Sequence, residues 1–491
     1  MMNSNLYAKL QAYGRSDFYG FHMPGHKRQM LYPFEDPFGI DITEIDGFDN
    51  LHHAEGILKE AQERAAMLYG SSETHFLVNG STAGLLSAIA GCTTRGGKII
   101  MARNCHKAVY HAAFLNELEV IYWMPRMDPV NGVNCGLPVD NLKKLLKENP
   151  DTQAIVMTSP TYDGVVSNVD KVVEIVHKCG IPLIVDEAHG AHFGFDPRFP
   201  KNSVGKGADV VIHSLHKTLP SMTQTALIHL NGSLADREKI RRYLSIYQTS
   251  SPSYVLMSSI DSCIGLLARR KEELFDAFYH KLSVVRDQLS HMQKLHLFSK
   301  EDAVRRGGAD LDPSKLLITT AGANVNGKEL SSLLRDRYHL EMEMETSGYV
   351  LALTSIADTK EGFQRLTSAL MEIDRQCVAD GKYRDYAEAA DTADEDAEMA
   401  NETAMTIWKA DQYRKKSVLL EDSAGSVSGE FVYQYPPGIP LIAPGEIISN
   451  KAVELICRAK EQGINVQGMK DFTAESIEIL DEIRRLSLIH I

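Results

Sequence analysis

The chain has 491 residues, of which 44% are hydrophobic and 24% are charged. This composition is ordinary for a soluble globular protein, and the length predicts two or three domains. The formal net charge of −13 argues against nucleic acid or an anionic membrane as a partner. The seven cysteines stand singly without a CxxC pair, and no apolar run is long enough to cross a bilayer. The N-terminus lacks a secretory pattern, so we expect reduced thiols and a cytoplasmic location.

The first half of the chain predicts an α/β domain. Residues 1–50 are rich in aromatics, Gly and Pro and predict an irregular arm, and helical spacing of apolar residues follows in Ala54–Tyr69. Helical stretches such as Val139–Lys147 and Val169–Cys179 then alternate with short apolar strands. The candidate strands are His75–Val78, Lys98–Ala102, Val120–Trp123, Ala154–Thr158, Pro182–Val185, Asp209–Ser214 and Ala226–Leu230. This alternation predicts a mostly parallel sheet covered by helices on both faces.

The second half predicts two smaller units. A long helical pattern begins in Tyr254–Ala268 and continues with several breaks through Lys271–Leu295. The acidic stretch Asp391–Glu398 predicts a solvated linker or helix face. The prolines of Tyr435–Pro440 predict a rigid, extended backbone. The apolar end Leu486–Ile491 is either a docked strand or a truncated terminus. The expected divisions are an arm (1–50), a large domain (51–290), a small α/β domain (291–385) and a C-terminal domain (386–491).

Two reactive side chains follow candidate strands. Lys217 comes directly after the strand Asp209–Ser214, and Asp186 ends the preceding strand. Polar residues at the carboxyl ends of strands are where α/β sheets place their chemistry. A lysine that forms a Schiff base and an acid that pairs with a pyridinium nitrogen suit pyridoxal phosphate. An exposed lysine and a helix-capping acid are the ordinary alternative for either residue alone, but their combination favours the cofactor.

A possible phosphate site precedes them in the chain. Gly80, Ser81 and Thr82 follow a strand and open the helical run Leu85–Ala90. Backbone N–H groups and the positive dipole end at a helix N-terminus bind anions. An ordinary Ser/Thr helix cap is the commoner use of such a tripeptide, and only the downstream Lys–Asp pair makes phosphate binding the favoured interpretation.

Histidines give a ring-stacking candidate and a rival metal site. His106 follows the strand Lys98–Ala102, where an imidazole can stack on a cofactor ring, although a solvent-facing histidine is the ordinary alternative. His189, His192 and His216, with Asp186 and Glu187 nearby, suggest zinc ligation as the rival interpretation. Because no metal-binding spacing on a helix is present, we expect no metal.

Six motifs, taken in chain order, resemble those of the Orn/Lys/Arg decarboxylase family, whose shorter bacterial branch has this length. They are His22–Lys27, Asn79–Thr82, Arg103–Lys107, Asp186–Gly190, Ser214–Lys217 and Tyr435–Pro440. The resemblance implies an aspartate-aminotransferase-type fold (fold type I) with pyridoxal phosphate as cofactor. Lys217 then resembles the Schiff-base lysine, Asp186 the partner of the pyridine nitrogen and His106 the stacking residue. The remaining implied cofactor contacts are Ser81, Thr82, His189, Ser214 and His216.

The resemblance also implies a partner and a reaction. Ser250, in the segment Thr249–Pro252, is similar to a residue that reaches the phosphate of the neighbouring subunit, which implies a homodimer or a larger assembly. The implied reaction is decarboxylation of arginine, lysine or ornithine to agmatine, cadaverine or putrescine. His106, His216 or Lys217 would return the proton to Cα. An aminotransferase or aldolase on the same fold, and a non-catalytic regulatory protein, remain the alternatives.

Glu446 is the candidate for recognition of the substrate's side chain. A basic side chain needs an acidic partner, and Glu446 follows the proline-rich path at the position where it can reach the site entrance. A surface glutamate that caps a helix beginning at Ile447 is the equally weighted alternative.

Overall fold

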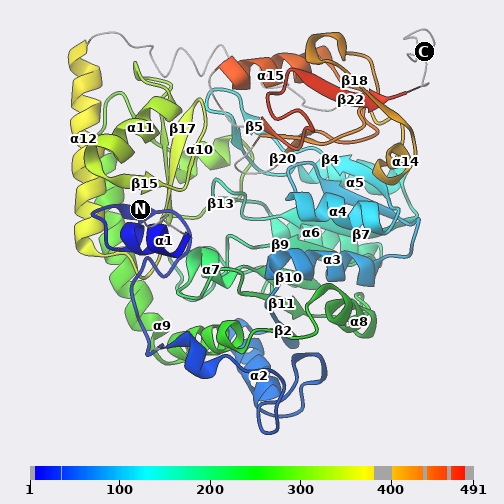
Figure 1. The fold of residues 1–491 in the computed structure, drawn as a ribbon, viewed down its shortest axis with the longest axis horizontal. Coiled ribbons are helices and arrows are strands. Elements are labelled where there is room, and N and C mark those ends of the chain that lie inside the picture. Colours follow the sequence, from blue (N-terminus) through cyan, green and yellow to red (C-terminus); the bar gives the residue numbers. More distant parts are fainter. Residues whose placement is uncertain (1–5, 35, 381–400, 435–438, 462–465, 482–491) are drawn as a thin grey trace.

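A computed structural model describes residues 6–34, 36–380, 401–434, 439–461 and 466–481 (Figure 1). Its largest sheet has seven strands in the order β2-β11-β10-β9-β7-β3-β4. They are β2 (Glu73–Leu77), β3 (Lys98–Ala102), β4 (Glu119–Trp123), β7 (Thr152–Thr158), β9 (Leu183–Asp186), β10 (Val210–His213) and β11 (Ala226–Leu230). β11 runs antiparallel to both of its neighbours, and the other pairings are parallel. The predicted α/β class and mostly parallel sheet are confirmed.

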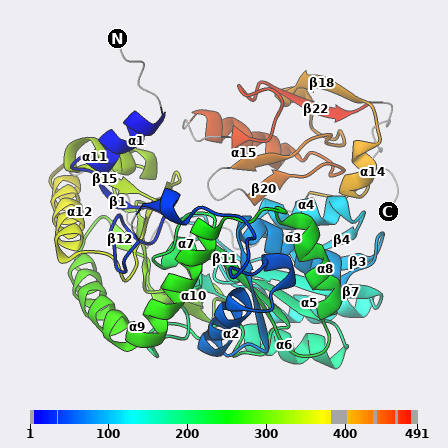
Figure 2. The same cartoon turned by 60° about the horizontal axis from the view of Figure 1, so that its bottom comes forward.

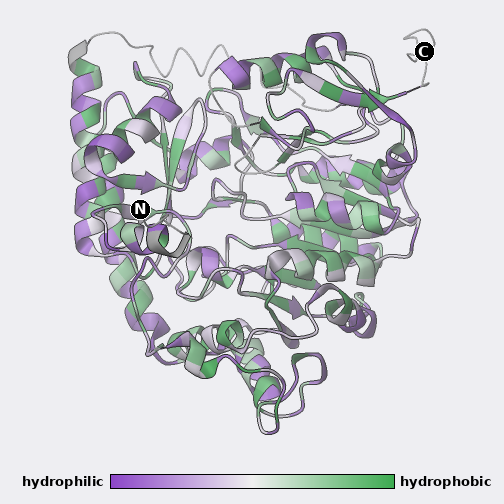
Figure 3. Cartoon of the chain, viewed as in Figure 1, coloured by the Kyte–Doolittle hydropathy of each residue, from purple (hydrophilic) through white to green (hydrophobic). Residues whose placement is uncertain are grey.

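Helices cover both faces of this sheet, as Figures 1 and 2 show. They are α2 (Ile57–Tyr69), α3 (Gly80–Cys92), α4 (Lys107–Leu115), α5 (Val139–Glu148), α6 (Val169–Lys178) and α8 (Arg237–Tyr247). In α6, the buried residues Val169, Val172 and Val176 recur at three- and four-residue spacing and form one apolar face. β9 and β10 are buried along their whole length, as expected for strands covered on both sides. Figure 3 shows the hydrophobic residues concentrated in these strands.

The long connecting helix differs from the prediction. α9 runs without interruption from Tyr254 to Leu289, although breaks were expected after Lys271. Its sequence lacks proline, and its charged stretch consists of good helix formers that point to solvent without breaking the backbone pattern. Ser253 caps the start, where its side chain accepts a hydrogen bond from Leu256 N.

A second sheet follows α9, with the order β12-β14-β17-β16. Its strands are β12 (His296–Leu297), β14 (Lys315–Thr319), β16 (Met344–Glu345) and β17 (Tyr349–Leu353), and α11 (Gly327–Tyr338) and α12 (Lys360–Asp380) pack beside it. The arm is more regular than predicted, because it contains α1 (Leu6–Gly14) and β1 (Tyr19–Phe21). β1 pairs in parallel with β15 (Leu340–Met342), so backbone hydrogen bonds fasten the arm to this part of the chain.

The C-terminal part has a core of its own. β18 (Lys415–Leu419) pairs with β22 (Ser476–Leu480), and β19 (Val432–Gln434) lies between β20 (Ile439–Ile442) and β21 (Val466–Gln467). α15 (Asn450–Glu461) packs its buried face against these strands (Figure 2). The predicted acidic linker, residues 435–438 of the proline-rich path and the apolar C-terminal end lie outside the described residues. The four proposed domain limits remain a prediction.

Candidate active site

Lys217 and Asp186 lie at neighbouring strand ends. β9 and β10 are parallel partners, with Ile212 opposite Asp186. β9 ends at Asp186, and β10 leads into the short helix α7 (Leu215–Thr218), which carries Lys217. Burial lowers the pKa of Lys217, while the charges of Asp186 and Glu343 oppose that shift. The sheet therefore brings together the lysine and the acid that the sequence singled out.

Asp186 is 3% exposed, and its Oδ1 accepts a hydrogen bond from Ala188 N at 3.1 Å. Burial raises the pKa of its carboxyl group, and the nearby Lys217 opposes that effect. A cationic partner that lies against a buried carboxylate and excludes water stabilises the charged form of that carboxylate. A protonated ring nitrogen is such a partner.

The start of α3 forms an anion cradle. Gly80 begins the helix with φ of 70°, and no side chain caps it. Its first backbone N–H groups therefore lack an intrahelical partner. Ser81 Oγ lies 2.5 Å from Ser214 Oγ, so hydroxyls from α3 and from the end of β10 converge there. Thr82, in the same first turn, is exposed.

His106 and His216 are both uncharged near neutral pH. His106 caps α4 by accepting a hydrogen bond from Ala108 N at 3.2 Å, and His216 Nδ1 donates to the Thr225 carbonyl at 3.0 Å. Burial, reinforced by Lys217, lowers the pKa of His106 to about 3. Burial also lowers the pKa of His216 to about 4. These imidazoles suit stacking and hydrogen bonding better than proton donation.

His189 contacts two lysines. Its Nε2 lies 3.0 Å from Lys217 Nζ, and its Nδ1 lies 2.9 Å from Lys315 Nζ. The ring of Tyr162 packs beside it, with ring centroids 4.4 Å apart. The Tyr162 hydroxyl donates to Glu343. Lys315, Tyr162 and Glu343 were not predicted from the sequence, although a lone lysine opening the apolar run Leu316–Ile318 was a visible signal.

The motif His22–Lys27, called the strap below, connects α7 to the second sheet by hydrogen bonds. Gly25 N donates to the His216 carbonyl at 2.7 Å, and a Cβ at Gly25 would lie 2.8 Å from the Leu219 backbone. Lys27 Nζ donates to the carbonyls of His22 and Leu353, both at 2.7 Å. Glycine is therefore required for the close approach, and the buried lysine fixes the loop.

The histidines of the rival metal site have separate partners. His192 pairs with Asp312 at 3.1 Å, His189 contacts the lysines and His216 bonds Thr225. Among the residues that the structure describes, no group of three or more potential ligands is placed to hold a metal ion.

The described helices also include none long and apolar enough to cross a membrane.

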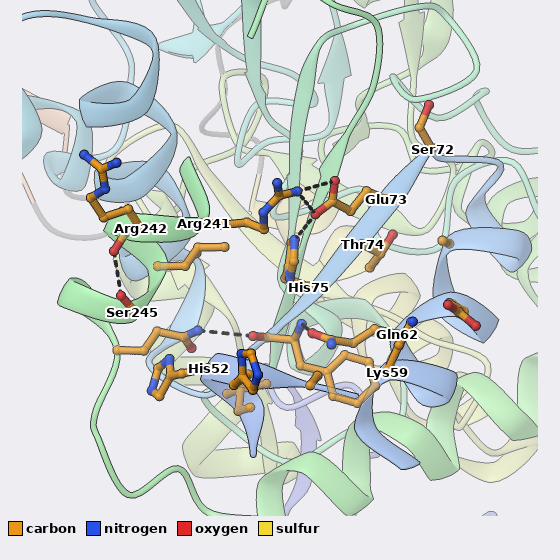
Figure 4. Close-up of a pocket in the computed structure, with 18 residues that line it drawn as sticks. His52, Lys59, Gln62, Ser72, Glu73, Thr74, His75, Arg241, Arg242 and Ser245 are labelled. Carbon is orange, nitrogen blue, oxygen red and sulfur yellow. Dashed lines mark hydrogen bonds and ion pairs between the residues drawn. The ribbon is translucent and has the colours of Figure 1, made fainter. Parts of the chain in front are cut away.

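Ser250 is exposed in the loop between α8 and α9. The adjacent Thr249 N donates to Asn79 Oδ1 at 3.2 Å, so the loop is held next to the start of α3. His52 Nε2 donates to the Thr249 carbonyl at 2.8 Å. His52 also lines a separate surface pocket of about 650 Å³ between α2, β2 and α8, which none of the predicted site residues lines (Figure 4).

Glu446 already has a cation from its own chain. It is 1% exposed, and its Oε2 lies 3.1 Å from Arg103 Nη2, with further hydrogen bonds from Asn401 and from Ala443 N. The alternative of a surface glutamate is wrong, because the side chain is buried and the nearest helix, α15, begins at Asn450. The ion pair connects the C-terminal part to the loop between β3 and α4, which also contains His106.

The variant Glu446→Gln distinguishes two roles of this carboxylate. One is the structural ion pair with Arg103, and the other is recognition of the substrate's side chain. Loss of a buried partner leaves Arg103 uncompensated, so we expect the free energy of unfolding to fall by about 3–5 kcal/mol. We expect KM for the amino-acid substrate to change little. Denaturant unfolding and steady-state kinetics provide both measurements, with the exposed Glu402→Gln as the matched control. A raised KM with unchanged stability would instead support recognition of the substrate by Glu446.

Solved structures share this fold. The lysine decarboxylase LdcF of Francisella novicida superposes with a TM-score of 0.76 at 19% identity, over 96% of this chain and 80% of that one. The constitutive lysine decarboxylase of Escherichia coli gives a TM-score of 0.71 at 20% identity, over 87% and 74% of the two chains. An alanine–glyoxylate aminotransferase from Nostoc gives 0.53 at 14% identity, over 64% and 86%. The chain therefore has the fold-type-I architecture of these enzymes.

The family follows from comparison of sequences. Residues 4–355 match the major domain of Orn/Lys/Arg decarboxylases, and residues 386–465 match their C-terminal domain. An arginine decarboxylase of Halalkalibacterium halodurans is 30% identical over 97% of both chains. The uncharacterized protein YaaO of Bacillus subtilis is 34% identical over 95% of this chain and 96% of its own. The chain belongs to the Orn/Lys/Arg decarboxylase family, and it is a decarboxylase of basic amino acids.

Proposed function

We propose that the protein binds pyridoxal phosphate at Lys217 and decarboxylates arginine to agmatine. The observation that carries this proposal is the pair formed by Lys217 and the buried Asp186 at neighbouring strand ends. The uncapped start of α3 and the hydroxyls of Ser81 and Ser214 supply the donors that a phosphate needs. The residues present therefore fit the cofactor.

The residues of the site divide the work of holding the cofactor. The bound cofactor supplies an electron sink for the bond that loses carbon dioxide. Asp186 would hold the proton on the ring nitrogen, and Ser81, Thr82, Ser214 and His216 would hold the phosphate. His106 would pack against the ring, and His189 lies beside Lys217. Because burial lowers the pKa of both His106 and His216, these imidazoles would orient the cofactor rather than act as cationic proton donors.

Arginine is the proposed substrate because of the relatives that match along their whole length. Besides the Halalkalibacterium halodurans protein, an arginine decarboxylase of Bacillus subtilis is 29% identical over 97% of this chain and 98% of its own. The constitutive lysine decarboxylase of Escherichia coli is more distant, with 24% identity over 75% of that protein.

An assay of carbon dioxide release with arginine, lysine and ornithine tests the substrate. We expect kcat/KM for arginine to exceed that for the other two by more than about tenfold, which corresponds to about 1.4 kcal/mol of transition-state discrimination. Chromatography of the products should show agmatine. A keto acid formed in place of carbon dioxide would favour an aminotransferase, and no turnover with any of the three would favour a regulatory role.

We further propose a cytoplasmic homodimer in which Ser250 reaches the phosphate site of the second copy. The exposed position of Ser250, in the loop between α8 and α9, leaves it accessible to a second copy and supports this arrangement. In the described residues the seven cysteines form no disulfide, and unpaired thiol chemistry of this kind is typical of a reducing compartment.

A further inference from the structure

Glu343 carries a carboxylate that two distant segments hold in place beside the candidate site. The residue lies between β15 and β16. Its Oε2 accepts a hydrogen bond from Met23 N at 2.7 Å, and its Oε1 accepts one from the Tyr162 hydroxyl. Met23 belongs to the strap, and Tyr162 follows β7 of the large sheet. The orientation of this carboxylate is therefore fixed before any ligand binds.

Two routes of contact connect this carboxylate to Lys217. The Tyr162 ring lies with its centroid 4.4 Å from that of His189, and His189 Nε2 lies 3.0 Å from Lys217 Nζ. The strap, which binds the other oxygen of Glu343, also donates a hydrogen bond to α7, the helix that carries Lys217. Glu343 thus lies at the side of the site where the second sheet meets the large one.

Other carboxylates around the site and the strap are already used within the chain. Each of them is at most 3% exposed and accepts hydrogen bonds from the protein. They are Asp163, Asp186, Glu187, Asp312, Asp358 and Glu446. Glu343 differs from these acids, because its side chain is partly exposed and forms no ion pair with another residue in the described part of the chain. A cation that enters the site can therefore reach Glu343 without displacing a partner.

The carboxylate of Glu343 can accept further hydrogen bonds. Two carboxylate oxygens offer about four lone-pair positions, and the donors from Met23 and Tyr162 occupy two of them. The remaining positions can accept a bidentate pair of bonds from a guanidinium group, whose planar N–H donors match carboxylate geometry. Because the side chain is already oriented, little of its conformational entropy is lost on binding.

We infer that Glu343 binds the guanidinium group of the substrate and sets the preference for a basic side chain. This inference rests on the proposed function and deepens it. The substrate's amino group must come to the cofactor at Lys217, and arginine carries its cation several bonds beyond Cα. Repulsion between carboxylates disfavours the opposite orientation, in which the substrate's own carboxylate would face Glu343. The acid therefore selects both the side chain and the direction in which the substrate binds.

Calorimetric titration of the cofactor-loaded enzyme with two amines tests the inference. Agmatine, the expected product, carries the guanidinium group, and N-carbamoylputrescine carries a neutral urea group of similar shape. Because both molecules have the same amino group, the difference between their affinities measures recognition of the cation. We expect the wild type to bind agmatine at least about thirtyfold more tightly, as is typical of a close, desolvated charge pair.

The variant Glu343→Gln should remove this difference. We expect its affinity for agmatine to fall by at least about thirtyfold, while its affinity for N-carbamoylputrescine changes little. The amide can keep both existing contacts, because its oxygen can accept from Met23 N and its nitrogen can donate to the Tyr162 hydroxyl. In steady-state kinetics, KM for arginine should rise by a larger factor than kcat falls.

Two further variants sharpen the comparison. Glu345→Gln is the matched control, because Glu345 is a partly exposed acid of the adjoining strand β16 that accepts from Ser331 Oγ of α11 at 3.3 Å. We expect this variant to bind both amines like the wild type. Glu343→Asp keeps the charge but shortens its reach, so agmatine should bind more weakly than to the wild type and more tightly than to Glu343→Gln.

Equal losses of affinity for the two amines in folded Glu343→Gln would overturn the inference, because a purely structural acid predicts that result. Unchanged affinity for agmatine would overturn it as well. If circular dichroism shows that Glu343→Gln does not fold, Glu343→Asp decides, since its preference for agmatine over N-carbamoylputrescine must decrease. A wild-type protein that releases no carbon dioxide from arginine would refute the proposed function itself. Normal turnover of arginine without a selective loss in the variants would refute the inference alone.

Discussion

Lys217→Ala should abolish the borohydride-reducible attachment of pyridoxal phosphate and lower turnover by more than about 10³-fold. The proposed phosphate donors at the start of α3 and the carboxylate of Asp186 are unaffected by the substitution, so the variant should still bind the cofactor weakly and reversibly. The variant loses both the covalent link and the catalysis that depends on it. Turnover should therefore fall by more than it would after the removal of one hydrogen bond.

Borohydride reduction followed by peptide mapping and mass spectrometry measures the link, and the carbon dioxide assay measures turnover. Lys201→Ala, which removes an exposed lysine, is the matched control and should retain both. Recovery of the label on a different lysine of the wild-type protein would show that the site has been misassigned.

Asp186→Asn should reduce kcat by about 10²–10³-fold while most of the cofactor is retained. An amide cannot hold a proton on the ring nitrogen by charge, and loss of one such preorganised electrostatic group typically has an effect of this size. The proposed phosphate contacts come from the start of α3 and from the segment that follows β10, so they do not depend on this side chain. The buried position of Asp186, which raises the pKa of its carboxyl group, makes the interaction with a cationic ring stronger than at an exposed site.

Cofactor content and kcat should be measured on the same preparation, and Asp170→Asn on the exposed side of α6 serves as the control. Turnover within a few-fold of the wild type would be incompatible with the role assigned to Asp186. A parallel loss of cofactor and activity would place the residue in cofactor retention and not in the chemical step.

The central sheet could be predicted from the sequence because its signals are local. All seven strands lie where short apolar runs were found, and Lys98–Ala102 and Ala226–Leu230 have the predicted bounds. Lys217 and Asp186 were expected to be neighbours because parallel strands present their carboxyl ends at one edge. The uninterrupted α9 was missed because charged residues disturb an apolar pattern without breaking a helix.

Contacts between distant segments could not be predicted in the same way. Lys315 and His189 are 126 positions apart, and Glu446 meets Arg103 across 343 positions. The periodicity of a sequence shows which face of an element is buried but not which element covers it. A glutamate at a site entrance and a glutamate neutralised by a buried arginine therefore have the same local sequence.

The strap formed by His22–Lys27 has a consequence for the order of assembly during synthesis. β1 needs β15 as its partner, and Lys27 needs the carbonyl of Leu353, which lies 326 positions further along the chain. A nascent chain emerges N-terminus first, so this segment leaves the ribosome long before its partners exist. Contacts of such long range are slow to form because the intervening loop must close first. The strap therefore docks late, and the surroundings of Lys217 become complete only after the second sheet has been translated.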